Sequence, residues 1–267
     1  MFHAMSQAHT NPQTGIQIKH LSVVYPNGKE ALHDANVSLK SGAITALVGM
    51  NGAGKSTLFK TIMGFLRAKT GQITIASMPL SYARKKQLVA YMPQAEDVDW
   101  NFPVSVWDVV MMGRYGYMNW LRIPRSRDRH IVRESIERVG LWELRDRQIG
   151  ELSGGQKKRV FLARALAQQA TILLLDEPFA GVDVTTERSM IELLVGLQQQ
   201  GHTILISTHD LASIQGFCDQ VILINRTILD YGETADVFTP ENLSRAFGGN
   251  IADLSVSKAW LMQKEAS

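Results

Sequence analysis

Residues 44–57 read ITALVGMNGAGKST, and this stretch decides the fold of the chain. An apolar run typical of a buried strand leads into a glycine-rich turn, which is followed by a helical pattern. Glycines in such a turn let successive backbone N–H groups face inward around phosphate oxygens, and the helix N-terminus adds positive potential. The strand, turn and helix together predict a phosphate-binding loop of the Walker A type over residues 49–57.

The residues of this loop have separate predicted roles toward a nucleotide. Lys55 is expected to reach the outer phosphates, and the Ser56 hydroxyl is expected to ligand Mg²⁺. The predicted nucleotide-binding positions of the loop are Gly49, Asn51, Gly52, Ala53, Gly54, Lys55, Ser56 and Thr57.

A second apolar run, ILLLDEP at residues 172–178, contains two adjacent acids. Such a strand carries a carboxylate to the edge of the sheet beside the phosphate loop, as a Walker B segment does. Asp176 is expected to hold Mg²⁺ through water, and Glu177 to orient or deprotonate the attacking water. These two motifs alone indicate a nucleotide hydrolase or a kinase.

Short apolar runs alternate with helical patterns through most of the chain, which predicts an α/β fold. The runs expected to be strands buried on both faces span 44–49, 171–177, 202–208 and 220–225. Helical patterns span 55–65, 104–115, 127–141, 155–169 and 185–201, the last ending at Gly201 as a cap, and Ser105 with Asp108 predicts a capping box. Residues 16–39 alternate and predict antiparallel strands, whereas about 95–165 predict a helical insertion.

Composition narrows the class of protein. Hydrophobic residues make up 45% and charged residues 20% of the 267, which is typical of a globular chain. The net charge of +3 and the interrupted basic clusters argue against a nucleic-acid partner. The one cysteine, Cys218, excludes an internal disulfide and favours a reducing compartment. No apolar segment has the roughly 18 to 20 residues that span a bilayer, so a membrane connection requires a partner.

LSGGQKKR, residues 152–159, lies upstream of the Walker B run at the head of a helical pattern. Ser153, Gly154 and Gly155 would place a hydroxyl and free N–H groups at a helix N-terminus, which is a second anion site. This sequence is similar to the signature of ABC-type ATPases. Together with the other motifs, it makes residues 16–250 resemble the ATP-binding subunit of an ABC transporter. Residues 1–15 are expected to form a disordered N-terminal tail, and residues 251–267 a C-terminal tail.

The resemblance implies roles for further residues. Gln94 would contact Mg²⁺ and the attacking water, and His209 the γ-phosphate, so that the implied catalytic residues are Glu177, His209, Gln94 and Lys55. The implied Mg²⁺ ligands are Ser56, Gln94 and Asp176, and the implied ATP contacts outside the loop are Tyr25, Ser153, Gly154, Gly155, Gln156 and Asp183. Tyr25 would stack on adenine, although a lone tyrosine in a strand could equally belong to the core. Next to Asp183, Val182 stands where the family more often has leucine.

Partners also follow from the resemblance. Because the loop and the signature lie on different subdomains, they cannot close on one nucleotide, and a head-to-tail dimer with a second copy is expected. The apolar run at 102–117 occupies the position at which the family docks an integral membrane permease. The candidate contacts are Trp107, Met111, Met112 and Tyr115. About half of them are expected to fill the core of the helical insertion instead. The chain is expected to lie peripherally on the cytoplasmic face of the inner membrane.

The amino-acid sequence of residues 93–118 and 147–169 is particularly similar to that of ATPase subunits of importers for manganese, iron or zinc. Such importers imply an indirect partner, an extracytoplasmic metal-binding protein. Alternatives are a subunit for another substrate or an exporter, which share the same module. A soluble DNA-repair or translation ATPase fits less well, because the chain has no room for a long coiled coil and has one motif set, and a small-molecule kinase would lack the signature.

Overall fold

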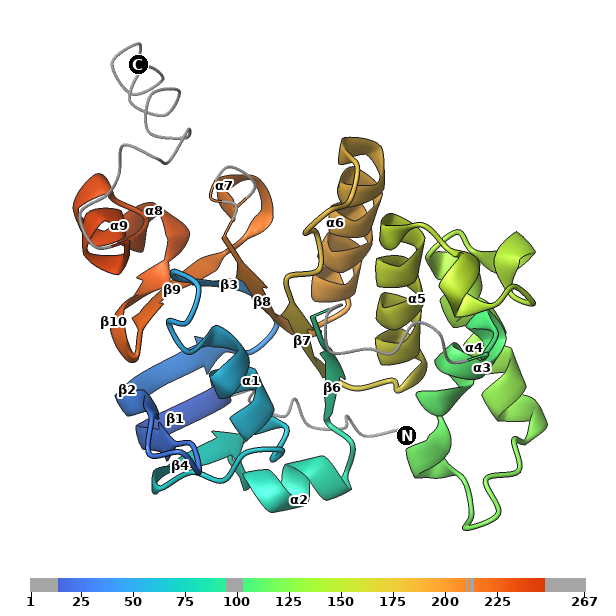
Figure 1. The fold of residues 1–267 in the computed structure, drawn as a ribbon, viewed down its shortest axis with the longest axis horizontal. Coiled ribbons are helices and arrows are strands. Elements are labelled where there is room, and N and C mark those ends of the chain that lie inside the picture. Colours follow the sequence, from blue (N-terminus) through green and yellow to red (C-terminus); the bar gives the residue numbers. More distant parts are fainter. Residues whose placement is uncertain (1–13, 95–102, 210, 212–213, 248–267) are drawn as a thin grey trace, which may run out of the picture.

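The computed structural model describes residues 14–94, 103–209, 211 and 214–247 (Figure 1). The two predicted tails lie almost entirely outside these residues. The strand that opens the described part begins at Thr14, two residues before the expected start of the domain at 16. The division into a domain and two tails therefore stays a prediction.

The larger sheet has the strand order β10-β9-β3-β8-β7-β6. Neighbouring strands from β6 to β9 run parallel, and β10 pairs antiparallel with β9. Their bounds are β3 Ile44–Val48, β6 Val89–Met92, β7 Ile172–Asp176, β8 Thr203–Thr208, β9 Gln220–Asn225 and β10 Thr227–Glu233. All four predicted buried strands are confirmed, since β3, β7 and β8 are buried along their whole length and β9 along its centre.

The smaller sheet is antiparallel, with the order β2-β1-β4-β5. Its strands are β1 Thr14–Val24, β2 Glu30–Lys40, β4 Thr70–Ile75 and β5 Met78–Pro79. The first two confirm the antiparallel pair predicted for residues 16–39. Figure 1 shows this sheet beside α1, Lys55–Ile62, so that the phosphate loop lies near both sheets.

Helices cover the remaining faces. Their bounds are α2 Leu80–Lys85, α3 Val106–Met112, α4 Ser126–Arg138, α5 Gly154–Ala167, α6 Val184–Gln199, α7 Ile214–Phe217, α8 Thr234–Val237 and α9 Pro240–Ala246. Short 3₁₀ turns lie at Tyr115–Tyr117, Trp142–Leu144 and Ile149–Glu151. The predicted capping box is present, because Ser105 Oγ accepts from the Asp108 N–H and Asp108 accepts from the Ser105 N–H. Gly201, at φ 92°, follows the end of α6 as expected.

The apolar run at 102–117 mostly fills the interior of the helical insertion. Within its described residues, α3 packs against α4 and α5, and Val106, Val110 and Met111 belong to the larger core. Met111 is only 7% exposed, so it is one of the candidates that fill the core and do not contact the permease. The reason is that α4 and α5 both pack against α3.

Cys218 lies in the same core. Burial raises the pKa of its thiol to about 12, with the nearby Asp219 carboxylate acting in the same direction. The thiol therefore stays protonated at neutral pH, which makes it a packing residue rather than a nucleophile.

Candidate functional site

The phosphate loop joins β3 to α1, and its geometry requires glycine at two positions. Gly54 has φ 104°, and a Cβ there would lie 2.6 Å from Leu32 Cδ2. A Cβ at Gly49 would lie 2.2 Å from the Ile224 carbonyl oxygen. Any larger residue would push the loop away from β2 and β9, so the close backbone approach depends on these glycines.

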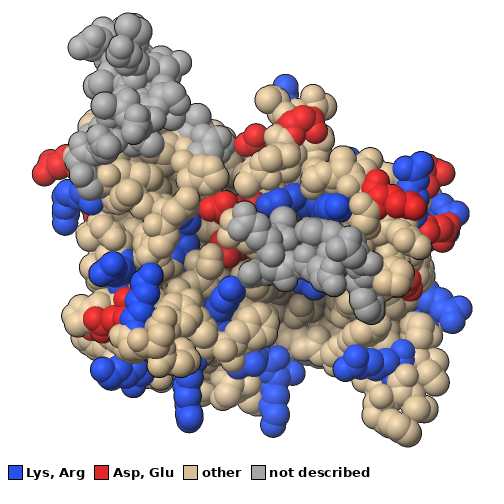
Figure 2. All heavy atoms as spheres, in the orientation of Figure 1, with Lys and Arg blue, Asp and Glu red and all other residues tan. Residues whose placement is uncertain are grey.

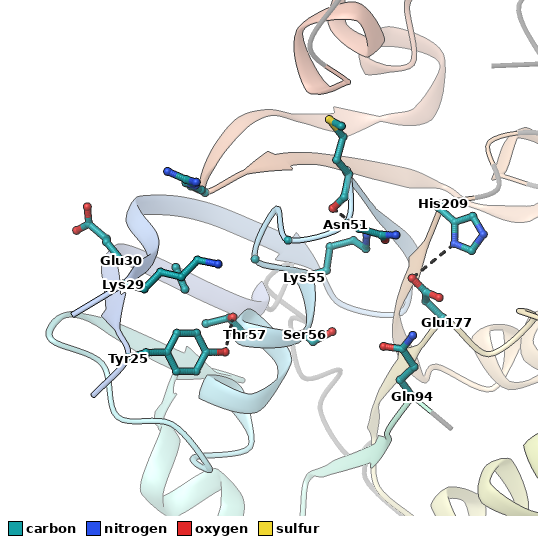
Figure 3. Close-up of a pocket in the computed structure, with 15 residues that line it drawn as sticks. Tyr25, Lys29, Glu30, Asn51, Lys55, Ser56, Thr57, Gln94, Glu177 and His209 are labelled. Atoms are coloured by element: carbon teal, nitrogen blue, oxygen red, sulfur yellow. Dashed lines mark hydrogen bonds and ion pairs between the residues drawn. The ribbon is translucent and has the colours of Figure 1, made fainter. Parts of the chain in front are cut away.

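The loop forms one wall of a cleft of about 550 Å³ (Figure 3). The structure brings most of the predicted site residues together there. Those that line the cleft are Tyr25, Asn51, Gly52, Gly54, Lys55, Ser56, Thr57, Gln94, Glu177 and His209. Gly49, Ala53 and Asp176 lie in or behind the wall and do not line it.

Sequence reasoning missed five residues that also line the cleft. They are Lys29, Glu30, Ala31, Met50 and Arg226. Two come from turns that carry no motif: Lys29 lies between β1 and β2, and Arg226 lies in the β9–β10 turn. The backbone N–H of Arg226 donates to the Ala53 carbonyl at 2.8 Å, which holds this turn against the phosphate loop. Arg226 has a positive φ of 57°, which marks a tight turn in the structure. Position 226 itself carries neither the glycine nor the asparagine that would have indicated it.

Tyr25 lies at the end of the cleft opposite Glu177 (Figure 3). Its hydroxyl hydrogen-bonds the Thr57 hydroxyl at 2.9 Å, and its side chain is half-buried rather than enclosed in the core. The ring therefore has a face available to the cleft, which favours the predicted stacking over the core alternative.

Lys55 lies at the centre of the site. Its ammonium donates to the Gly49 carbonyl at 2.7 Å and to the Met50 carbonyl at 3.3 Å. Burial lowers the pKa of Lys55, whereas the carboxylates of Glu177 and Asp176 act in the opposite direction. A polyphosphate in the cleft would add negative charge beside this buried ammonium and favour its charged form.

The two acids at the end of β7 face different surroundings. Asp176 is 1% exposed and accepts from Ser207 Oγ at 2.5 Å and from Tyr91 Oη at 3.3 Å. Glu177 points into the cleft, where its Oε1 lies 3.5 Å from His209 Nδ1. Asp176 is thus a fixed, buried carboxylate and Glu177 a carboxylate that can reach a ligand.

The donor set at the loop suits magnesium. Ser56 and Gln94 line the cleft with a hydroxyl and an amide oxygen, and Asp176 supplies a carboxylate behind its wall. Hard oxygen donors of this kind are the ligands that Mg²⁺ prefers. Among the described residues, no group of three or more His, Cys, Asp or Glu side chains is arranged to hold a metal. Mg²⁺ bound by Ser56 and Gln94 would take phosphate oxygens and water as its further ligands.

The signature residues lie apart from the cleft. Ser153 caps α5, its Oγ accepting from the Gln156 N–H at 3.3 Å and Gln156 Oε1 accepting from the Ser153 N–H at 2.9 Å. A Cβ at Gly155 would lie 3.9 Å from Asp183 Oδ2, so the signature and Asp183 share one surface. Asp183 caps α6, and the hydrogen bond from the Thr186 N–H lowers its pKa. Ser153, Gly154, Gly155, Gln156 and Asp183 do not line the cleft.

Comparison with known proteins fits this arrangement of motifs. The model of the ABC transporter family matches residues 32–180, from β2 to just beyond the Walker B acids. The chain belongs to the ABC transporter family. This ABC transporter chain is 62% identical to the manganese transport system ATP-binding protein MntA of Synechocystis, over 91% of its own length and 93% of the relative. It is 60% identical to the chelated iron transport system membrane protein YfeB of Yersinia pestis, over 90% of its length and 81% of the relative.

Solved ABC transporter structures share the fold. The structure of cbiO1 from Clostridium perfringens, part of the ABC transporter complex cbiONQ, superposes with a TM-score of 0.73 at 30% identity, covering 94% of this chain and 99% of that one. The predicted fold class is therefore confirmed: an ABC-type α/β domain with an antiparallel sheet.

As an ABC transporter ATP-binding subunit, the chain is a nucleotide-binding ATPase of a transport system. Such a subunit implies a membrane permease as partner. Within the residues described here, no helix is both long enough and apolar enough to cross a bilayer.

Proposed function

We propose that this chain hydrolyses ATP in the cleft, with Mg²⁺, to power import of a divalent metal cation through a membrane permease. The observation that carries the proposal is the convergence of the phosphate loop, Gln94, Glu177 and His209 on one cleft. Relatives at 62% and 60% identity belong to manganese and chelated-iron transport systems. The cargo is therefore proposed to be manganese, iron or zinc.

The residues of the cleft divide the chemistry among them. Lys55 and the loop N–H groups bind the phosphates, Tyr25 stacks on the adenine, and His209 contacts the γ-phosphate. The Glu177 carboxylate orients a water and takes its proton as the water oxygen bonds to the γ-phosphorus and the bond to ADP breaks. Ser56, Gln94 and Asp176 would hold Mg²⁺, which neutralises charge on the phosphates when it is bound.

A second copy of the chain completes the site. The signature residues lie at the N-terminus of α5, where backbone N–H groups suit an anion, and Asp183 lies beside them outside the cleft. In a head-to-tail dimer this surface would cap the ATP held by the partner. Hydrogen bonds to a charged γ-phosphate contribute about 1.5 to 3 kcal/mol each. Moving a two-state system from 1:99 to 99:1 needs about 5.5 kcal/mol, which several such bonds supply and hydrolysis removes.

The permease is proposed to dock on the helical insertion. Of the earlier candidates, Trp107 stacks edge-on against Trp142, and Tyr115 lies beneath the Arg122 guanidinium, so both are partly covered, as is Met112. The segment between α3 and α4 instead exposes large apolar side chains: Tyr117 44%, Trp120 87%, Leu121 52% and Ile123 58%. This exposed loop, residues 117–123, is the better docking candidate.

The charge around the exposed loop suits a position against a membrane. Figure 2 shows Lys and Arg side chains along the lower edge of the molecule, where Figure 1 places α2 and the segment between α3 and α4. Basic side chains near a bilayer attract the anionic headgroups that surround a permease. This supports a peripheral location of the chain on the cytoplasmic side.

Replacing Trp120 with aspartate is expected to weaken association with the permease by at least about tenfold, because an exposed aromatic anchor that the permease would bury is replaced by a charge that must be desolvated. ATP binding should change less than about twofold, since Trp120 does not line the cleft. Co-purification with the permease and nucleotide titration measure the two effects. The control is Tyr231→Asp on β10, where a 45% exposed aromatic should tolerate the charge. Equal loss in both variants would contradict docking at this loop.

Transport by the reconstituted complex tests the proposed function as a whole. Proteoliposomes containing this chain, its permease and an extracytoplasmic metal-binding protein should accumulate manganese, iron or zinc when ATP is on the side of this chain. Omitting Mg²⁺ should abolish uptake. Export of the metal, or ATP-driven uptake of a different class of solute only, would reject import of a divalent metal while keeping the ATPase activity.

A further inference from the structure

Lys158 is a buried lysine that lies outside the cleft. It lies on α5, one turn beyond the signature glycines, and is 6% exposed. Its ammonium donates to the backbone carbonyl of Glu177 at 2.5 Å. Burying an ammonium group costs free energy unless the group is hydrogen-bonded, and this hydrogen bond offsets part of that cost for Lys158.

The backbone of Glu177 has an unusual conformation. Its φ is 47°, in the left-handed region that residues other than glycine seldom adopt. A conformation of this kind persists only where the surroundings hold it. The direction of the Cα–Cβ bond depends on it, and here that bond directs the carboxylate into the cleft beside His209.

Hydrogen bonds hold Glu177 on both sides. Its N–H donates to Ser207 Oγ at 3.0 Å, and that hydroxyl also donates to Asp176 Oδ1. Its carbonyl accepts from Lys158. The first hydrogen bond comes from β8 and the second from α5, so two different elements fix the backbone of one residue.

We propose that Lys158 is a positioning residue, which holds the backbone of Glu177 so that its carboxylate faces the attacking water. The proposal rests on the proposed role of Glu177 as the water-activating group. Lys158 does not line the cleft, so it acts through Glu177 and not on the nucleotide.

A second consequence follows from the position of Lys158 on α5. The N-terminus of this helix carries Ser153 and the signature glycines, which in the proposed dimer contact the partner's ATP. The same helix, one turn later, holds this chain's own Glu177. When the signature of this chain closes over the partner's nucleotide, a shift of α5 would be transmitted through Lys158 to Glu177 in this chain's own cleft. The two ATP sites of the dimer are thereby linked.

The test compares Lys158→Met with Lys158→Arg in the full chain, alongside the parent. Methionine keeps the length and removes the donor, and it is expected to lower kcat for ATP hydrolysis at least about tenfold with KM and the ATP Kd within about twofold. Arginine restores a donor and is expected to recover kcat to within about threefold of the parent. The matched control is Lys19→Met, an exposed lysine on β1 that does not line the cleft, which should keep the parent kcat.

The outcomes separate positioning from a loss of packing. An unchanged kcat in Lys158→Met would overturn the proposal, as would a fall in kcat that arginine does not rescue or that comes with an equal loss of ATP binding. Thermal unfolding of each variant shows whether α5 is still docked. Glu177→Gln is measured in parallel: if it is slow while Lys158→Met is normal, only the role of Lys158 is rejected. If Glu177→Gln is normal and Lys158→Met is slow, the water-activating role is rejected and Lys158 acts by another route.

Discussion

Replacing Glu177 with glutamine is expected to lower ATP hydrolysis by about 10² to 10⁴, the contribution of a positioned general base. The amide keeps the size of the side chain but cannot take the proton from water. ATP binding should remain within about threefold of the parent, because the phosphates are held by Lys55 and the loop. Steady-state hydrolysis and nucleotide titration measure the two effects.

The same variant should accumulate as an ATP-bound dimer. Since the γ-phosphate is not removed, the hydrogen bonds that close the two copies persist, and the dimer should be visible by sedimentation with Mg²⁺ and ATP. Glu192→Gln, an exposed acid on α6 paired with Arg188, is the control and should behave as the parent. Turnover of Glu177→Gln at the parent rate would show that another group activates the water.

Mixed dimers give the second large effect. A Lys55→Ala chain loses phosphate binding in its own cleft, and a Ser153→Arg chain blocks the surface that caps the partner's cleft. Each homodimer is expected to hydrolyse ATP below about 1% of the parent rate, because both composite sites are damaged. Mixing the two variants equally should restore about a quarter of the parent rate, since half of the dimers are mixed and each has one intact site.

The restored activity depends on how the two chains are arranged. In a mixed dimer, the damaged cleft and the damaged signature meet in one site, and the other site is wild type in both parts. Separately purified mixed dimers carrying two different tags give the rate without the statistical factor. If both homodimers are inactive and mixing restores nothing, either each cleft uses the signature of its own chain or both sites must act together. A chain with both substitutions mixed with the parent distinguishes these cases, because only the first leaves the mixed dimer active.

Most of the cleft could be predicted because its residues lie on local patterns. Lys55 and Ser56 follow a buried strand and open a helix, and Glu177 follows another buried strand, so parallel pairing of β3, β8 and β7 brings them to one edge of the sheet. Residues that reach the cleft from turns, such as Lys29 and Arg226, carry no such pattern and were missed.

The sequence left open which side chains of the insertion are exposed, because packing between distant elements decides exposure. Met111 fits a helical apolar face, but two other helices cover that face, and only the fold shows it. The exposed apolar side chains of the insertion lie further along, around Trp120, in a segment without regular periodicity. Strand β6 is only four residues long, too short to stand out from its surroundings.

The sequence by itself determined the class of fold, the phosphate loop, the order of the motifs and the family. These depend on short stretches in which a strand, a turn and a helix follow each other directly, so neighbouring residues contain the information. Tertiary structure alone decided which side chains of the insertion face outward, which turns close the cleft and that Lys158 on α5 holds the backbone of Glu177. Those contacts join residues far apart in the chain, and no local pattern encodes them.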